Sequence, residues 1–238
     1  MVAPRLLCAV LFAAWALAAE AGVRDMVVVE ARGVRIALGQ TIDGSAPLAL
    51  ESGQQVTLMA QDGRVFHLRG PSTAAPLPAE TPALANVALA VRLMTTQQEA
   101  RERAGVIRGG AARIPPDPWL IDVGASGVRC LPPGGAATLW RGERANALQP
   151  LKIAPADRSW RFEADWPASD ERYAVPDAVP LMPRESYLVR LGPREVSLTF
   201  VELPRALAND AMRAGYMMEI GCDAQAKSLL ARSERAVR

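Results

Sequence analysis

Apolar and polar residues alternate over short stretches in the first third of the chain, a pattern typical of half-buried strands. We expect strands at Met26–Val29, Val34–Leu38, Pro47–Leu50, Gln55–Ala60 and Val65–Arg69. The last two flank Asp62-Gly63, a dipeptide that favours a type I′ hairpin turn because both residues tolerate positive φ. Turn residues recur about every 8–12 positions, which predicts a small all-β module.

A helical pattern follows this module. Thr81-Pro82 supplies an N-cap and a first-turn proline. Apolar residues then recur at the spacing of one helix face, at Leu84, Val87, Ala88 and Val91. We expect a helix over residues 82–104 and, because residues 105–118 are rich in glycine and proline, a linker after it.

The second half of the chain again alternates short apolar stretches with turns. Candidate strands are Trp119–Val123, Val128–Leu131, Ala137–Trp140, Leu151–Ile153, Trp160–Ala164, Tyr187–Leu191 and Val196–Glu202. This number of short strands predicts an immunoglobulin-like β-sandwich over residues 119–203. Residues 166–184, rich in Pro, Ala and Asp, are expected to form a long ordered loop within it.

The C-terminal stretch 204–238 has helical periodicity and is expected to pack on the sandwich. Pro204 can start a first helix, Gly221 ends it, and Asp223 can cap a second. The predicted fold class is therefore mainly β: a small β module with a following helix over residues 22–104, then a sandwich with C-terminal helices.

The N-terminus has the pattern of a cleavable secretory signal over residues 1–21. Arg5 precedes the uncharged apolar run Leu6–Leu17, and two A-x-A cleavage motifs follow, ending at Ala18 and Ala21. The apolar run is shorter than the roughly 20 residues of a membrane-spanning helix. We therefore expect a periplasmic or secreted protein that has no transmembrane anchor after cleavage.

Cysteine usage agrees with export. Cys8 lies inside the expected leader, too early for a lipoprotein cysteine, so Cys130 and Cys222 remain in the mature chain. In an oxidising compartment this pair predicts a disulfide that joins the sandwich to the C-terminal helices. The bridge would close a loop of about 90 residues, worth roughly 4–5 kcal/mol in the chain-entropy model. Two buried free thiols are the alternative.

A glycine-rich rhythm runs through residues 34–71. It consists of Gly39 to Gly44, the apolar alternation of Leu48 to Leu58, and then Asp62-Gly63. The rhythm resembles the repeats of FecR-type periplasmic domains, and the resemblance implies a β module that contacts protein partners. FecR proteins carry a transmembrane helix and a cytoplasmic segment ahead of this domain, where here we expect a secretory leader. No functional residue of that family transfers to this chain.

Charge composition argues against a nucleic-acid partner. The 27 Lys and Arg are nearly balanced by 25 Asp and Glu, for a net charge of +2. The arginines alternate with acids instead of forming a basic run, which is typical of solvated surfaces.

Candidate chemistry is sparse. His67, the single histidine, is expected on the solvent face of a strand, with no G-x-S-x-G motif to support a Ser-His-Asp site. Glu163 and Asp165 share one face of a strand and are candidates for a glycosidase pair, but solvent-facing surface charges are the favoured interpretation. We therefore expect no catalytic set, metal or cofactor.

Aromatic residues gather in the second domain. Those on predicted strands are expected in the core. Trp166 and Tyr173, in the predicted loop, are candidates for stacking on sugar rings. The leading hypothesis is a non-catalytic periplasmic adaptor that binds an envelope protein. A glycan-binding module that uses Trp166 and Tyr173 is the alternative, and a hydrolase that uses Glu163 and Asp165 comes third.

Overall fold

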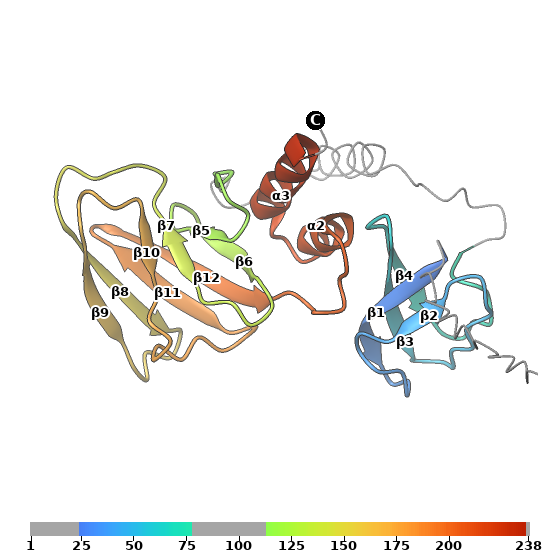
Figure 1. Cartoon of the computed structure of the whole chain (residues 1–238). Helices are drawn as coiled ribbons and strands as arrows, with labels where there is room; N and C mark the ends of the chain where they lie inside the picture. Colours follow the sequence, from blue (N-terminus) through green and yellow to red (C-terminus); the bar gives the residue numbers. More distant parts are fainter. Residues whose placement is uncertain (1–23, 78–112, 237–238) are drawn as a thin grey trace, which may run out of the picture.

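The computed structural model describes residues 24–77 and 113–236 (Figure 1). The expected leader, the expected helix over 82–104 and the first part of the expected linker lie outside these residues. The described residues form three β-sheets followed by two helices, so the mainly β fold class is confirmed. Within residues 24–77 and 113–236, no helix is long and apolar enough to cross a membrane.

The first sheet is antiparallel, with the strand order β2-β1-β3-β4. Its strands are β1 (Asp25–Arg32), β2 (Thr41–Asp43), β3 (Gln55–Ala60) and β4 (Val65–Arg69). The expected hairpin between β3 and β4 is confirmed, and Gly63 adopts a φ of +83° in its turn. The alternation of β3 places Val56, Leu58 and Ala60 in a core with Met26 and Val28 of β1.

The predictions of two strands in this module were wrong. Residues 34–37 are irregular and lead into a turn at Leu38-Gly39, where Gly39 adopts a φ of +80° and its N–H donates to the Val28 carbonyl. The Pro47–Leu50 stretch contributes a single bridge, between Leu50 and Ser72. Pro47 lacks an N–H, so it cannot donate to a sheet ladder.

The other two sheets face each other as a sandwich. The three-stranded sheet has the order β10-β7-β5 and the five-stranded sheet the order β6-β12-β11-β8-β9. Their strands are β5 (Leu120–Asp122), β6 (Gly127–Leu131), β7 (Thr138–Trp140), β8 (Gln149–Pro155), β9 (Phe162–Trp166), β10 (Arg172–Ala174), β11 (Ser186–Leu191) and β12 (Arg194–Glu202). One core joins the sheets: Ile121 and Leu139 come from the first, and Leu151, Ile153 and Phe200 from the second.

Two helices close the chain, α2 (Asp210–Glu219) and α3 (Asp223–Ala236). The first begins six residues after Pro204, because residues 204–207 form a turn in which Leu207 N donates to Pro204 O. Asn209 caps it: its Oδ1 accepts the Met212 N–H at 2.8 Å, satisfying a free helical donor. The Asn209 Nδ2 also donates to Gln61 O at 3.1 Å, which ties the cap to the first sheet.

The helices pack on both β units, not on the sandwich alone. Figure 1 shows α2 between the first sheet and the sandwich. A single core cluster contains Val27, Val29 and Met59 of the first sheet together with Cys130 of β6 and many helical residues. The helical members include Met212, Tyr216, Met217, Ala226 and Leu229.

A disulfide and a buried glutamine hold this arrangement. Cys130 of β6 is bonded to Cys222, between the two helices, with Cα atoms 6.0 Å apart. Gln225 of α3 is buried, and its amide accepts from Cys130 N and donates to Cys130 O and Pro118 O, each at 2.8 Å. The outer edge of β6 is thereby closed by a side chain instead of another strand.

Candidate ligand-binding cavity at the end of the sandwich

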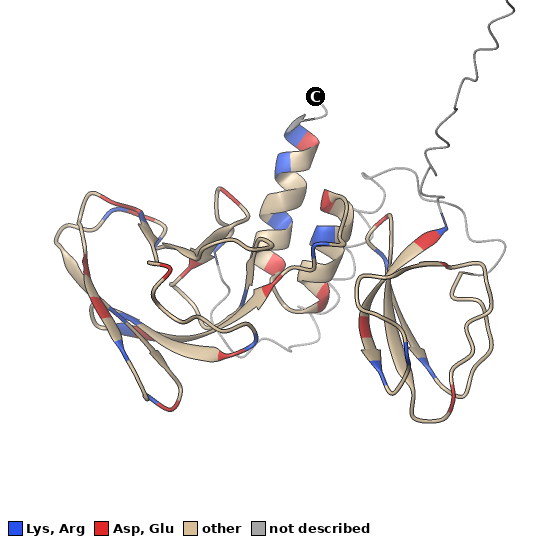
Figure 2. Cartoon of the chain, turned by 60° about the horizontal axis from the view of Figure 1, so that its bottom comes forward, with Lys and Arg blue, Asp and Glu red and all other residues tan. Residues whose placement is uncertain are grey.

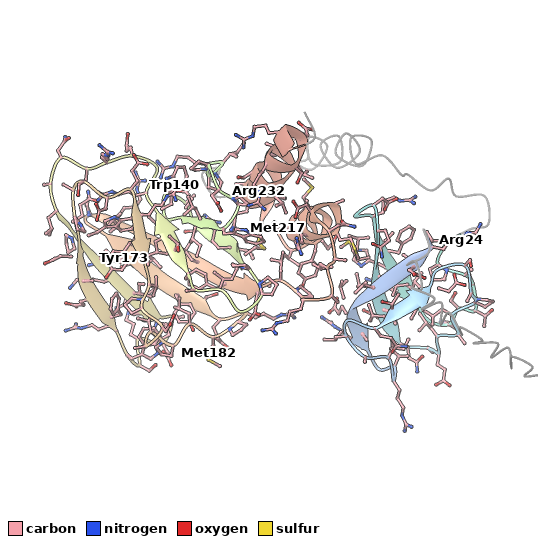
Figure 3. All side chains as sticks on the ribbon, in the orientation of Figure 1. Arg24, Trp140, Tyr173, Met182, Met217 and Arg232 are labelled. Carbon is pink, nitrogen blue, oxygen red and sulfur yellow. A yellow bond between two sulfur atoms is a disulfide. The ribbon has the colours of Figure 1, made fainter. Side chains whose placement is uncertain are left out.

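The expectation that Trp166 is an exposed loop residue was wrong. It is the last residue of β9 and has 0% exposure, because the inward alternation of Phe162 and Ala164 continues through it. Its Nε1 donates to Asp170 O at 2.8 Å. Tyr173, labelled in Figure 3, lies on β10 and is partly buried against the same core. The centroids of the Trp166 and Tyr173 rings are 5.6 Å apart. A buried Trp166 ring cannot stack on a sugar, so nothing here favours the glycan hypothesis.

The candidate carboxylates lie on an open strand face. Glu163 is exposed and accepts from Lys152 Nζ at 2.9 Å, while Arg161 Nε lies 3.1 Å away. The hydrogen bond from Lys152 and the charge of Arg161 hold the pKa of Glu163 below its usual value. A hydrolase acid needs a raised pKa. Neither Glu163 nor Asp165 lines the cavity at the end of the sandwich, so that cavity gives the hydrolase hypothesis no support.

His67 lies where the first sheet meets α2. Its Nδ1 is 3.3 Å from Thr57 Oγ1, and its Nε2 is 3.2 Å from Glu219 Oε1. A hollow of about 150 Å³ adjoins it, lined mainly by polar residues of β1, β3 and β4. Across residues 24–77 and 113–236, no three His, Cys, Asp or Glu side chains gather as a metal site would require.

An open cavity of about 740 Å³ lies at one end of the sandwich. Residues 141–150, which run from the end of β7 into the start of β8, form one side, and residues 191–194, where β11 turns into β12, form another. Arg113 and Gly124 complete it. Its size lies within the roughly 300–1,000 Å³ of ligand pockets in proteins.

One ion pair at this end joins a buried carboxylate to an exposed arginine. Asp122 of β5 is 3% exposed and accepts from Arg113 Nη2 at 2.8 Å, from Arg113 N at 3.0 Å and from Gly124 N at 2.9 Å. Arg113 also donates to Arg141 O at 2.6 Å and stacks 5.1 Å above the Trp140 ring. The charges of Arg113 and Asp122 therefore cancel each other.

Arg141, directly after β7, is buried differently. It is 6% exposed, and its guanidinium lies 5.1 Å over the Trp166 ring. Its Nη2 donates to Pro167 O at 2.6 Å and to Ala168 O at 2.8 Å. Its Nε and Nη1 are also buried, yet they have no hydrogen-bond partner in the part of the chain that the structure describes. The great majority of buried polar atoms in proteins have such a partner.

Arg129 of β6 is a matched comparison within the same domain. It is 5% exposed, and its three nitrogens donate to Asp122 O, Val128 O and Ala125 O at 2.6–3.1 Å. Burial lowers its pKa, while the charge of nearby Asp122 acts in the opposite direction. Arg129 is thus a satisfied structural arginine, and Arg141 is not.

The cavity rim combines charge with apolar surface. Arg144 and Arg194 are exposed cations, and Glu143 is the one acid among the described residues that line the cavity. Leu148, 55% exposed, contributes an apolar wall together with Leu191, Pro150 and Pro193. Figure 2 shows charged residues of both signs interspersed along the described chain.

Sequence reasoning did not find this site. Arg113 lies in the expected linker and Arg141 in an ordinary turn, and nothing in the composition separates them from the other basic residues. The glycine at position 142 was the available local signal of this site. It adopts a φ of +86°, and the Arg113 guanidinium occupies the space where a side chain would project.

Comparison with known proteins gives no relative: no protein-family model, curated protein or solved structure matches this chain.

Proposed function

We propose that this chain is an exported, non-catalytic adaptor of the cell envelope that holds a partner protein at the arginine-lined cavity of its sandwich. The observation that carries the proposal is Arg141, a buried cation with unpaired donors beside an open cavity. The described lining residues offer charge and apolar surface for recognition, without an acid–base pair or a base-activated nucleophile for chemistry.

The framework of the molecule supports an adaptor. The first sheet, the helices and β6 share one core, which fixes the first sheet relative to the sandwich. Two binding surfaces on one chain can then meet a partner, or two partners, in a fixed geometry. The FecR-type rhythm of residues 34–71 agrees with a first sheet that contacts proteins.

Export is supported by the sulfur chemistry and by the leader pattern. The Cys130–Cys222 disulfide is typical of an oxidising compartment outside the cytoplasm. Mass spectrometry of the protein from its native host tests this part: we expect a chain that lacks residues 1–21 and has no free thiol. An intact leader with both thiols free would overturn the export proposal.

The partner is tested by site-specific photocrosslinking in the native host. A photoreactive amino acid at Leu148 stands on the cavity rim, and one at Met182 is its matched control. Both positions are similarly exposed, at 55% and 59%, and Met182 lies at the far end of the sandwich from Trp140 (Figure 3). We expect one discrete protein adduct from Leu148 and none from Met182. Equal adducts from both positions, or none from Leu148, would contradict the proposal.

A further inference from the structure

Arg141 is a buried positive charge beside the cavity. The Asp122 carboxylate, also buried, is paired with the exposed guanidinium of Arg113. Within the described residues, the Arg141 guanidinium donates to the carbonyl oxygens of Pro167 and Ala168, and no carboxylate forms an ion pair with it. A buried cation without a counter-charge is unfavourable unless an anion compensates it.

Charges of both signs surround the cavity. Arg144, Arg194 and Glu143 line it, and Glu171 lies 3.8 Å from Arg144, where it offsets part of that charge. A phosphate group carries about −1.5 to −2 charges at neutral pH, whereas a carboxylate carries one. A carboxylate supplies the one negative charge that the Arg141 guanidinium lacks.

The apolar walls of the cavity indicate the chemistry of the remainder of the ligand. Leu148 is a large apolar side chain left 55% exposed at the rim, and Pro150, Leu191 and Pro193 continue the apolar surface. Sites that combine apolar walls with a few placed polar groups bury a ligand body and orient its polar end. A carboxylate attached to an apolar body matches both parts of this cavity.

We infer that the cavity binds a single carboxylate on an apolar body, with Arg141 supplying the buried charge and with Arg144 and Arg194 supplying the exposed donors. This deepens the proposed function, because it names the chemistry by which the cavity would hold its partner. Arg141 acts here through its charge, and Arg144 and Arg194 make the first contacts. The carboxylate can come from a small acid or from the C-terminus of a partner protein.

Direct binding of defined probes tests the inference. The probes are hexanoate for a small acid, N-acetyl-Ala-Leu with a free C-terminus for a protein terminus, the neutral amide of each, and inorganic phosphate, all at constant ionic strength. Binding is followed by the NMR cross-peaks of the arginine Nε–H groups and by the melting temperature. We expect saturable shifts of the Arg141 Nε–H peak with at least one of the two acids, and no shifts with the amides.

Variants tie the response to the cavity. Arg141→Met keeps a flexible apolar chain against Trp166 and should weaken carboxylate binding by about tenfold or more, as expected for loss of a charged partner. Arg144→Gln with Arg194→Gln changes only exposed rim residues and should weaken binding several-fold while the melting temperature stays the same. Arg35→Gln, at an exposed arginine in the connection between β1 and β2, is the matched control and should bind as the unaltered protein does.

The inference is overturned if an amide binds as tightly as its acid, if phosphate binds more tightly, or if Arg141→Met retains full binding. Should Arg141→Met fail to fold, unchanged binding by the double rim variant overturns it instead. The two proposals fail separately. A partner crosslinked at Leu148 with no carboxylate response removes this inference alone, while hexanoate binding without any crosslinked protein removes the adaptor and leaves the carboxylate site.

Discussion

Two regions of this molecule bury polar side chains, and they do so in opposite ways. We call the contacts of α2 and α3 with the two β units the helical seam. In the seam, Gln225 is 2% exposed and uses its amide oxygen and nitrogen fully, in three bonds to backbone. At the cavity, Arg141 is 6% exposed and leaves two nitrogens unpaired among the described residues.

The difference separates residues that stabilise the fold from residues available for binding. A satisfied buried group contributes to the folded state alone, whereas an unsatisfied one gains most when a ligand supplies the missing partner. Substitutions in the seam should therefore lower stability and leave carboxylate binding intact, while substitutions at the cavity should do the reverse. The predictions below test this separation, starting with the largest expected effect.

Removal of the disulfide in the helical seam should lower the free energy of unfolding by the largest amount. For Cys130→Ala with Cys222→Ala, we expect a loss of about 3–5 kcal/mol in the free energy of unfolding, because the bridge spans 92 residues and constrains a long loop of the unfolded chain. Chemical denaturation measures the loss, and the oxidised and reduced forms of the unaltered protein provide the control. A stability equal to that of the oxidised protein would show that the seam does not depend on the bridge.

Substitution of Gln225 should cause the next largest loss of stability. Gln225→Met keeps the length and burial of the side chain but leaves Cys130 N, Cys130 O and Pro118 O without their partner. Buried groups without partners cost about 1–3 kcal/mol each when they cannot reach water, and partial relaxation should bring the total to about 2–4 kcal/mol. Arg232→Met, at an exposed position of the same helix, should change stability by less than about 0.5 kcal/mol. Equal effects of the two substitutions would show that the hydrogen bonds of Gln225 do not stabilise the helical seam.

Gly215 tests how closely α2 approaches the first sheet. A Cβ at this position would collide with the backbone carbonyl of Gly63, so we expect Gly215→Ala to destabilise by about 1–3 kcal/mol. Helix propensity alone predicts the opposite sign, a gain of up to about 1 kcal/mol. Ala231→Gly, at an exposed position of α3, measures that propensity in reverse. A stabilised Gly215→Ala protein would mean that α2 does not dock on the β3–β4 turn.

The sequence predicted the elements whose signals are local. The bounds of β3 and β4 agree with the expected Gln55–Ala60 and Val65–Arg69, because strict alternation and Asp62-Gly63 mark them. The end of β9 was missed, although Trp166 continues its alternation, because Pro167 and the polar residues that follow resemble a loop. The short β10 at Arg172–Ala174 is defined by pairing with β7 and has little pattern of its own.

The candidate site could not be predicted from local sequence patterns, for a different reason. Its key residues, Arg113 and Arg141, are 28 positions apart and meet through the packing of β5 against β7. Whether a given arginine is satisfied, as Arg129 is, or left with unpaired donors, as Arg141 is, depends on carbonyl groups that tertiary structure brings near it. Periodicity reports which face of a strand is buried, but it does not report which buried charge lacks a partner.

The smallest expected effect belongs to the exposed ion pair of Glu163, which solvent screens. Its pKa is lowered in the folded protein, first by the Lys152 hydrogen bond, so its contribution to stability is present above its usual value of 4.5 and is lost as the pH falls through the lowered folded value. Glu163→Gln should therefore lower the melting temperature at pH 7 by about 1 °C or less, and the difference should vanish in acid. A drop as large as that of Gln225→Met would show that the open strand face, and not only the seam, carries stability. Unaltered carboxylate binding by Glu163→Gln would keep this face separate from the cavity as well.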